Sequence, residues 1–148
     1  MSLTDWEKNG WLKSHKTSQQ EIQNLLRIIE RDLDDCQKMN VSADWRFAIA
    51  YNAALQCCTI PLFCSGYMPT RGQSIHYRVI QSLVFTLGSN FDEIVAYLNS
   101  CRVKRNISDY EAIGSISESE VKELTDVVEE LHKKVKNWLK RNFPGYEL

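Results

Sequence analysis

The chain has 148 residues, of which 43% are hydrophobic and 25% are charged. These values are ordinary for one soluble globular domain, and the length is enough to bury a core without covalent staples. With 18 basic and 19 acidic side chains the formal net charge is -1. Global charge therefore gives no argument for nucleic-acid binding, and any such role must rest on a local patch.

The cysteines and the apolar runs bear on the cellular compartment. The chain has five cysteines, an odd number, of which Cys57 and Cys58 are adjacent, and it contains no CxxC motif. This pattern argues against a disulfide framework or a zinc site. We expect small buried hydrophobic side chains in a reducing cytosol. No apolar run approaches the roughly 20 residues that cross a bilayer, and the polar N-terminus does not resemble a signal peptide. A cytoplasmic protein with no membrane association is expected.

Residues 1–17 form a lead-in segment that carries apolar side chains in polar surroundings. Gly10 is expected to break this segment. We expect its apolar side chains to dock it onto the main body, although the two tryptophans could instead bind a ligand at the surface. These side chains are Trp6, Trp11 and Leu12.

The first long helix is expected to begin at Ser18. Ser18 and Glu21 match the capping-box pattern, in which a serine and a glutamate three residues later satisfy the free N–H groups of the first turn. Apolar residues then recur at helical spacing. They are Ile22, Leu25, Leu26, Ile29 and Leu33.

A second helix is expected to begin after Ser42. Residues 45–65 are apolar on nearly all sides of a helix, which is typical of a central helix or of one that packs against a partner subunit. Pro61 should kink this helix or end its regular part. Asn52 and Gln56 must find hydrogen-bond partners if they are buried.

Glycine and proline punctuate the middle of the chain. Residues 66–72 form the clearest loop, with two glycines and a proline. Residues 74–87 predict the next helix, which Gly88 and the two polar residues after it end. Another helix is predicted from residue 91 to about residue 112.

The last helix begins at a second capping box, Ser117 to Glu120, and ends at Pro144-Gly145. Basic residues crowd its last turns, where they interact favourably with the helix dipole. This basic cluster therefore needs no nucleic acid to explain it. Its members are Lys133, Lys134, Lys136, Lys140 and Arg141.

No alternating strand pattern is visible, so the predicted fold class is all-α. We expect an up-and-down antiparallel bundle of four long helices plus a short helical segment. Residues 1–148 should form a single domain, with a lead-in over 1–17, the bundle over 18–142 and a tail over 143–148.

The densest group of polar side chains lies in the helix predicted from residue 91. Arg102, Arg105, Asn106 and Asp109 fall at i, i+3, i+4 and i+7, which places them in one stripe. Two guanidinium groups, an amide and a carboxylate on one face can bind a phosphate, or they can bind each other. Tyr110 adds a hydroxyl, which is a poor base at neutral pH because its ordinary pKa is about 10.

His76 is a second candidate, because it begins a helix beside Arg78 and directly follows the glycine-rich loop. A lone histidine is more often a surface or capping residue than a catalyst. His15 and His132 lie in polar sequence and are expected to be exposed. The spacing of the three histidines argues against a metal site, and no P-loop, Rossmann or nucleophile-elbow motif is present.

The arginine-rich stripe, residues 102–110, resembles the R…RNxxxY/H signature of HEPN domains. Further segments are similar to one bacterial and archaeal branch of that family, and the similarity covers most of residues 10–142. These segments are Gly10-Trp11-Leu12, Arg31-Asp32-Leu33, residues 45–56, Gly66-Tyr67 and residues 76–80.

The resemblance implies a helical bundle that usually forms a homodimer, with the motifs of both subunits facing one cleft. Many HEPN proteins are metal-independent ribonucleases in toxin–antitoxin, abortive-infection or CRISPR systems, and others are partners of small nucleotidyltransferases. In the ribonuclease type the motif arginine, here Arg105, binds the scissile phosphate and a histidine five residues later handles protons. Tyr110 replaces that histidine here, so phosphate binding through Arg105 and Asn106 is implied more directly than catalysis.

Three interpretations remain. The first is a binding or interaction module for a nucleotide, RNA or a nucleotidyltransferase partner in a toxin–antitoxin or defence-type system. The second is a metal-independent endoribonuclease in which Arg105 holds the phosphate and Tyr110 transfers protons, with His76 as the missing imidazole if the fold brings it to the cleft. The third is a structural dimer in which Arg102 and Arg105 pair with Asp109. No cofactor is expected.

Overall fold

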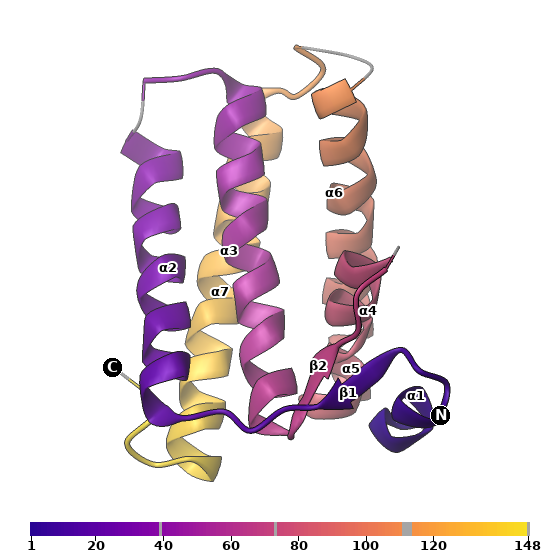
Figure 1. The fold of residues 1–148 in the computed structure, drawn as a ribbon. Coiled ribbons are helices and arrows are strands. Elements are labelled where there is room, and N and C mark those ends of the chain that lie inside the picture. The colour runs from indigo at the N-terminus through magenta and orange to yellow at the C-terminus, as the bar shows by residue number, and fades with distance from the viewer. Residues whose placement is uncertain (39, 73, 111–113, 148) are drawn as a thin grey trace.

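The computed structural model describes residues 1–38, 40–72, 74–110 and 114–147, with the backbone alone for residues 107–110. The chain is mostly helical, as predicted, and successive long helices run in opposite directions (Figure 1). The long helices are α2 (Gln19–Lys38), α3 (Ala43–Cys64), α6 (Asp92–Tyr110) and α7 (Glu118–Asn142). The short elements are α1 (Leu3–Lys8), β1 (Leu12–Ser14), β2 (Tyr67–Pro69), α4 (Ile75–Gln81), α5 (Leu83–Thr86) and the 3-10 turn η1 (Ser89–Phe91).

Helix α3 lies at the centre of the fold, as its apolar composition predicted. It packs against α2, α6 and α7, and its buried side chains include Phe47, Tyr51 and Ile60. By length and composition alone α3 could cross a membrane, which corrects the expectation that no apolar run is long enough. Most of α3 is buried inside the fold, so packing by neighbouring helices accounts for the same composition.

The helix starts predicted at Ser18, Ser42 and Ser117 are confirmed by their caps. The Ser18 hydroxyl accepts the N–H of Glu21 at 3.1 Å, and the Ser42 hydroxyl caps α3 in the same way. Ser117 and Glu120 form the complete reciprocal capping box at the start of α7. Such caps stabilise a helix by about 1 kcal/mol each, and they depend on local sequence alone.

The helix predicted over residues 74–87 is interrupted at Ser82, which separates α4 from α5. Ser82 is buried, and its hydroxyl donates to the carbonyl of Val79 at 2.6 Å, a local bond that competes with regular helical pairing. The interruption leaves α4 packed against both α3 and α6. Pro61 lies in the last turn of α3, which continues only to Cys64.

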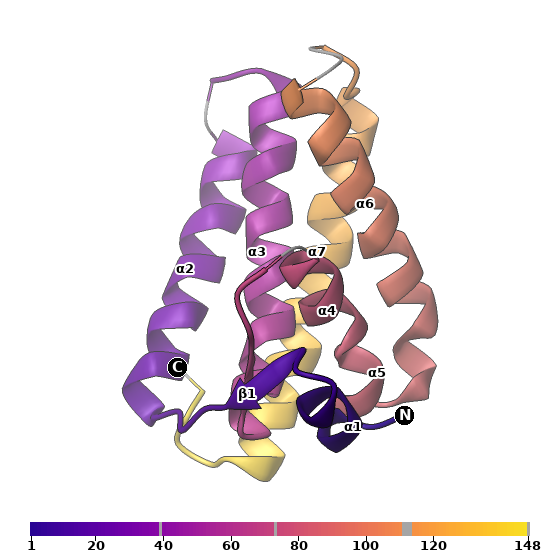
Figure 2. The ribbon, with the colours of Figure 1, turned by 45° about the vertical axis from the view of Figure 1, so that its right-hand side comes forward.

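Two short strands correct the expectation of a chain without strands. β1 and β2 pair antiparallel, with Leu12 opposite Pro69. Three residues are too few to show alternation, so neither strand was visible in the sequence. The pairing ties the lead-in segment to the body beside α4 and α5 (Figure 2), and Trp6 is buried with its ring 5.1 Å from that of Phe85. Docking of the lead-in is therefore confirmed.

The polar side chains of α3 find partners, as their burial requires. The Asn52 amide donates to the Asp32 carboxylate at 2.7 Å, and Gln56 donates to Asn52 at 3.5 Å. Asp32 is only 4% exposed and also accepts from Arg31 at 3.0 Å. Hydrogen bonds from Asn52 and Arg31 thus offset the cost of burying the Asp32 carboxylate.

The cysteines behave as small hydrophobic side chains, as expected. All five are free, and only Cys64 is partly exposed. Burial raises the pKa of each thiol, so the neutral form prevails at pH 7.

Candidate functional site

Two arginines of α6 lie over tyrosine rings of neighbouring helices. The Arg102 guanidinium carbon is 5.7 Å from the ring centre of Tyr77 in α4, and that of Arg105 is 5.6 Å from the ring centre of Tyr51 in α3. Both distances fall within the range of cation–π attraction. The rings therefore hold the two positive charges beside α4, where His76 lies.

His76 is fixed between these charges and the core. Its Nδ1 atom lies 3.3 Å from the Tyr51 hydroxyl oxygen, within hydrogen-bond distance. Burial lowers the pKa of His76, and the positive charges of Arg105 and Arg102 lower it further. Burial raises the pKa of Tyr51. At pH 7 the site therefore combines a neutral imidazole and a neutral phenol with two guanidinium cations.

A pocket of about 320 Å³ opens where the first turn of α4 faces α6. We name it the Arg102 pocket. No carboxylate is found among those of its lining residues that the structure describes, and the Nε atom of Arg102 is buried without a hydrogen-bond partner there. Its lining residues are Gly72, Ser74, Ile75, His76, Tyr77, Arg102 and Asn106.

The Arg102 pocket can therefore accept an anion. Guanidinium N–H groups bind phosphate or carboxylate oxygens in pairs, and Asn106 adds an amide at the rim. Tyr77 is 37% exposed, so part of its ring is open to a flat ligand group. The neutral imidazole of His76 can accept a proton from a bound group.

The fold brings together four residues that the sequence singled out. Arg102, Asn106 and His76 line one pocket, and Arg105 lies over the Tyr51 ring, close enough to His76 to lower its pKa. The side chains of Asp109 and Tyr110 lie outside the described part of the chain. Their predicted roles, as ion-pair partner and proton-transfer group, stay predictions.

Tyr51 and Tyr77 were missed as site residues. Tyr51 falls on an apolar helix, where an aromatic residue is ordinarily part of the core, and no local signal marks its hydroxyl as a partner for His76. Tyr77 directly follows His76, but its position under Arg102 depends on how α4 packs against α6. Only a spatial contact could identify either residue.

His15 and His132 were predicted to be exposed, but both are partly buried. His15 lies 2.7 Å from the Glu21 carboxylate and against the ring of Phe63. His132 is half-buried, and its Nε2 atom has no hydrogen-bond partner in the described part of the chain. Burial and the nearby charge of Lys136 lower the pKa of His132.

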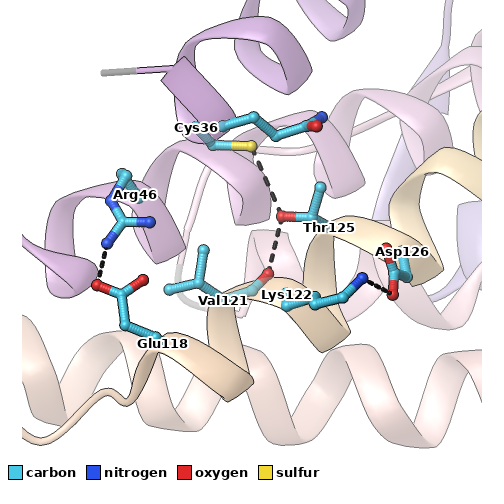
Figure 3. Close-up of a pocket in the computed structure, with 8 residues that line it drawn as sticks. Cys36, Arg46, Glu118, Val121, Lys122, Thr125 and Asp126 are labelled. Carbon is cyan, nitrogen blue, oxygen red and sulfur yellow. Dashed lines mark hydrogen bonds and ion pairs between the residues drawn. The ribbon is translucent and has the colours of Figure 1, made fainter. Parts of the chain in front are cut away.

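A larger pocket, of about 430 Å³, lies between α2, α3 and α7. We name it the Glu118 pocket. Figure 3 shows Arg46 and Glu118 pointing toward each other as an ion pair, with Lys122 bound to Asp126 at 3.0 Å. The pocket is lined by Cys36, Gln37, Arg46, Glu118, Val121, Lys122, Thr125 and Asp126. Each of its four charged groups thus has a partner of opposite sign.

No protein-family model, curated protein or solved structure matches this chain. The resemblance to HEPN domains therefore stays a prediction made from sequence motifs.

Proposed function

We propose that this chain is a binding module whose Arg102 pocket holds the phosphate group of a nucleotide or of single-stranded RNA. The observation that carries the proposal is the position of Arg102. Its guanidinium lies over the half-open ring of Tyr77, at a pocket without a carboxylate among its described lining residues. The positive charge is thus held beside an aromatic ring in the lining of a pocket.

Nucleotides fit this combination of groups better than a simple anion does. A guanidinium supplies paired donors for phosphate oxygens, and an exposed tyrosine ring provides a stacking surface for a base. Arg102 and Tyr77 supply both within one pocket. The sequence resemblance to HEPN domains, many of which act on RNA, supports the same ligand class.

A titration with uridine 5′-monophosphate tests the proposal, with uridine as the ligand that lacks the phosphate. Calorimetry should detect the monophosphate and not the nucleoside, and Arg102→Ala should weaken binding about tenfold or more, since hydrogen bonds to charged groups contribute about 1.5–3 kcal/mol. Lys134→Ala removes a cation from a separate pocket and should change nothing. Equal binding by wild type and Arg102→Ala would refute the proposal.

A second candidate function is metal-independent RNA cleavage, which the position of His76 favours. In this reaction the ribose 2′-oxygen attacks the adjacent phosphorus and the 5′-oxygen leaves, which gives a 2′,3′-cyclic phosphate and a 5′-hydroxyl end. The neutral imidazole of His76 would take the 2′-hydroxyl proton, and Arg102 and Arg105 would stabilise the charge on the phosphate. Water would protonate the leaving oxygen. His76 thereby takes the role that the sequence assigned to Tyr110.

Incubation of varied RNAs with the purified protein in EDTA separates the two candidates. Cleavage that disappears in both His76→Gln and Arg105→Ala would establish the ribonuclease. If His76→Gln binds RNA as the wild type does and neither protein cleaves it, the chain is a binding module alone. Cleavage that survives both substitutions would come from a contaminant or from a different site.

The HEPN-like bundle, the homodimer and the nucleotidyltransferase partner remain part of this proposal. The order of the four long helices supports the bundle, whereas the homodimer and the partner rest on the sequence motifs around Arg105 alone. Size-exclusion chromatography with light scattering checks the homodimer directly.

A further inference from the structure

A second pocket, of about 240 Å³, adjoins the Arg102 pocket. We name it the Arg78 pocket. The two pockets share Ser74 and Ile75 as lining residues, so they meet at the start of α4. The Arg78 pocket is lined by Gly10, Trp11, Pro69, Thr70, Arg71, Ser74, Ile75 and Arg78.

Arg78, like Arg102, holds its guanidinium close to aromatic rings. Its guanidinium carbon is 3.6 Å from the ring centre of Trp11 and 5.9 Å from that of Tyr77. Arg102 lies 5.7 Å from the same tyrosine ring. Two guanidinium groups therefore lie close to one ring that is partly open to solvent.

The arginines among the described lining residues of the two pockets make this surface basic. Arg71 and Arg78 line one pocket and Arg102 the other, while no carboxylate is found among the described lining residues of either. The whole chain carries a net charge of only -1. This surface is thus a local basic patch with interleaved aromatic rings, the arrangement that binds single-stranded nucleic acids.

We propose that the Arg102 and Arg78 pockets form one track that binds two phosphates of a single-stranded RNA, with an unpaired base stacked on Tyr77. The proposal rests on the proposed function and adds a minimum ligand length and a second phosphate contact. Stacking on Tyr77 requires an unpaired base, so duplex RNA should be excluded. The lead-in segment contributes to the track, because Trp11 orients Arg78.

Fluorescence anisotropy with labelled oligouridylates of one, two, four and eight nucleotides tests the track. Wild-type affinity should rise from the mononucleotide to the longer strands, because only a strand reaches both pockets. The eight-nucleotide strand should also bind more tightly than duplex RNA of equal length. Equal affinity for the mononucleotide and the eight-nucleotide strand would overturn the second phosphate contact.

Arg71→Ala and Arg78→Lys are the informative variants. Arg78→Lys keeps the charge beside Trp11 and removes the flat guanidinium, which guards against disruption of the lead-in packing. Both should leave mononucleotide binding unchanged and weaken binding of the eight-nucleotide strand, by about tenfold when combined. The slope of log affinity against log salt should fall by about 0.7 for Arg71→Ala, which removes a charge, and should stay unchanged for Arg78→Lys, which keeps it. Lys134→Ala is the control for general electrostatics.

The outcomes separate this inference from the proposed function. If Arg102→Ala weakens every ligand but the Arg71→Ala/Arg78→Lys double variant binds long strands like the wild type, the track is refuted and the phosphate site stands. If neither mononucleotide nor strand binds the wild type, both proposals fail. If duplex binds as tightly as single strands, stacking on Tyr77 is refuted.

Discussion

The Glu118 pocket and the Arg102 pocket differ in which partners their charged side chains have. The Glu118 pocket is the larger, at about 430 Å³, yet its arginine and lysine are each bound to a carboxylate within the pocket. The Arg102 pocket, at about 320 Å³, has a guanidinium over an aromatic ring and a buried Nε atom without a hydrogen-bond partner in the described part of the chain. Among the described residues, the basic groups of the Glu118 pocket thus have carboxylate partners, whereas the Arg102 Nε atom has no hydrogen-bond partner.

The two pockets would also differ in the interactions that an entering anion has to displace. An anion that enters the Glu118 pocket must compete with the carboxylates of Glu118 and Asp126. An anion that enters the Arg102 pocket meets donors held by a neutral tyrosine ring, which no phosphate has to displace. We therefore expect the binding free energy of an anion to be more favourable in the Arg102 pocket than in the Glu118 pocket.

The largest effect is expected when a carboxylate is introduced into the Arg102 pocket, so that its arginine has an internal partner like the arginine of the Glu118 pocket. Asn106→Asp places a carboxylate of the same shape at the rim, one helical turn after Arg102, where the two groups can pair. Affinity for uridine 5′-monophosphate should fall about tenfold, because the phosphate now competes with an internal anion. Calorimetry measures the change.

Asn106→Gln is the matched control, since it lengthens the amide without adding charge. If Asn106→Asp binds the monophosphate as tightly as the wild type, the charge argument for this pocket is wrong.

The second largest effect is a loss of stability, expected when the Tyr51 hydroxyl beside His76 is removed. Tyr51→Phe removes the hydroxyl that lies 3.3 Å from Nδ1 of His76, and the absence of one such bond should lower the free energy of unfolding by about 1 kcal/mol. Urea denaturation gives the value. A variant as stable as the wild type would mean that the Tyr51–His76 contact contributes nothing to the position of the imidazole.

A smaller effect on stability is expected when a carboxylate is removed from the Glu118 pocket. Glu118→Gln removes the partner of Arg46 and should lower the free energy of unfolding by about 0.5 kcal/mol, since Glu118 is largely exposed. Thermal or urea denaturation measures this decrease. Nucleotide affinity should not change, and weaker nucleotide binding would show that the two pockets are not independent.

The smallest effect is expected from pH. Burial lowers the pKa of His76 and of His132 below the ordinary value of 6.5, so the unfolded chain binds protons more readily than the folded one. Their contribution to stability is present above pH 6.5 and is lost as the pH falls through the folded values. Urea midpoints between pH 7.5 and 5 should decline, and His76→Gln should reduce the decline. A midpoint that rises toward pH 5 would contradict the sign.

Much of the helical structure could be predicted because its signals are local. Ser18, Ser42 and Ser117 each cap a helix through bonds to residues three positions on, and Pro144-Gly145 follows the last helix directly. The β1–β2 pair could not be predicted, because each strand is three residues long and its partner is more than 50 residues away. The break at Ser82 depends on the packing of α4 as well as on the serine.

The candidate site could be predicted only in part for the same reason. The spacing of Arg102, Arg105 and Asn106 on one helix places them together without knowledge of the fold. Tyr51 and His76 come from α3 and α4, and only the packing of these helices against α6 brings them to the arginines. The histidine beside the two arginines therefore lies on a different helix from theirs.

The most direct test of the central claim follows the His76 imidazole by nuclear magnetic resonance. Titration with pH, with and without saturating uridine 5′-monophosphate, should show that the ligand raises the pKa of His76, because a bound phosphate stabilises the imidazolium beside Arg102 and Arg105. The pKa of His132, which lies on α7, should stay where it is. An unchanged His76 titration in the presence of bound monophosphate would place the ligand elsewhere and contradict the assignment of this pocket.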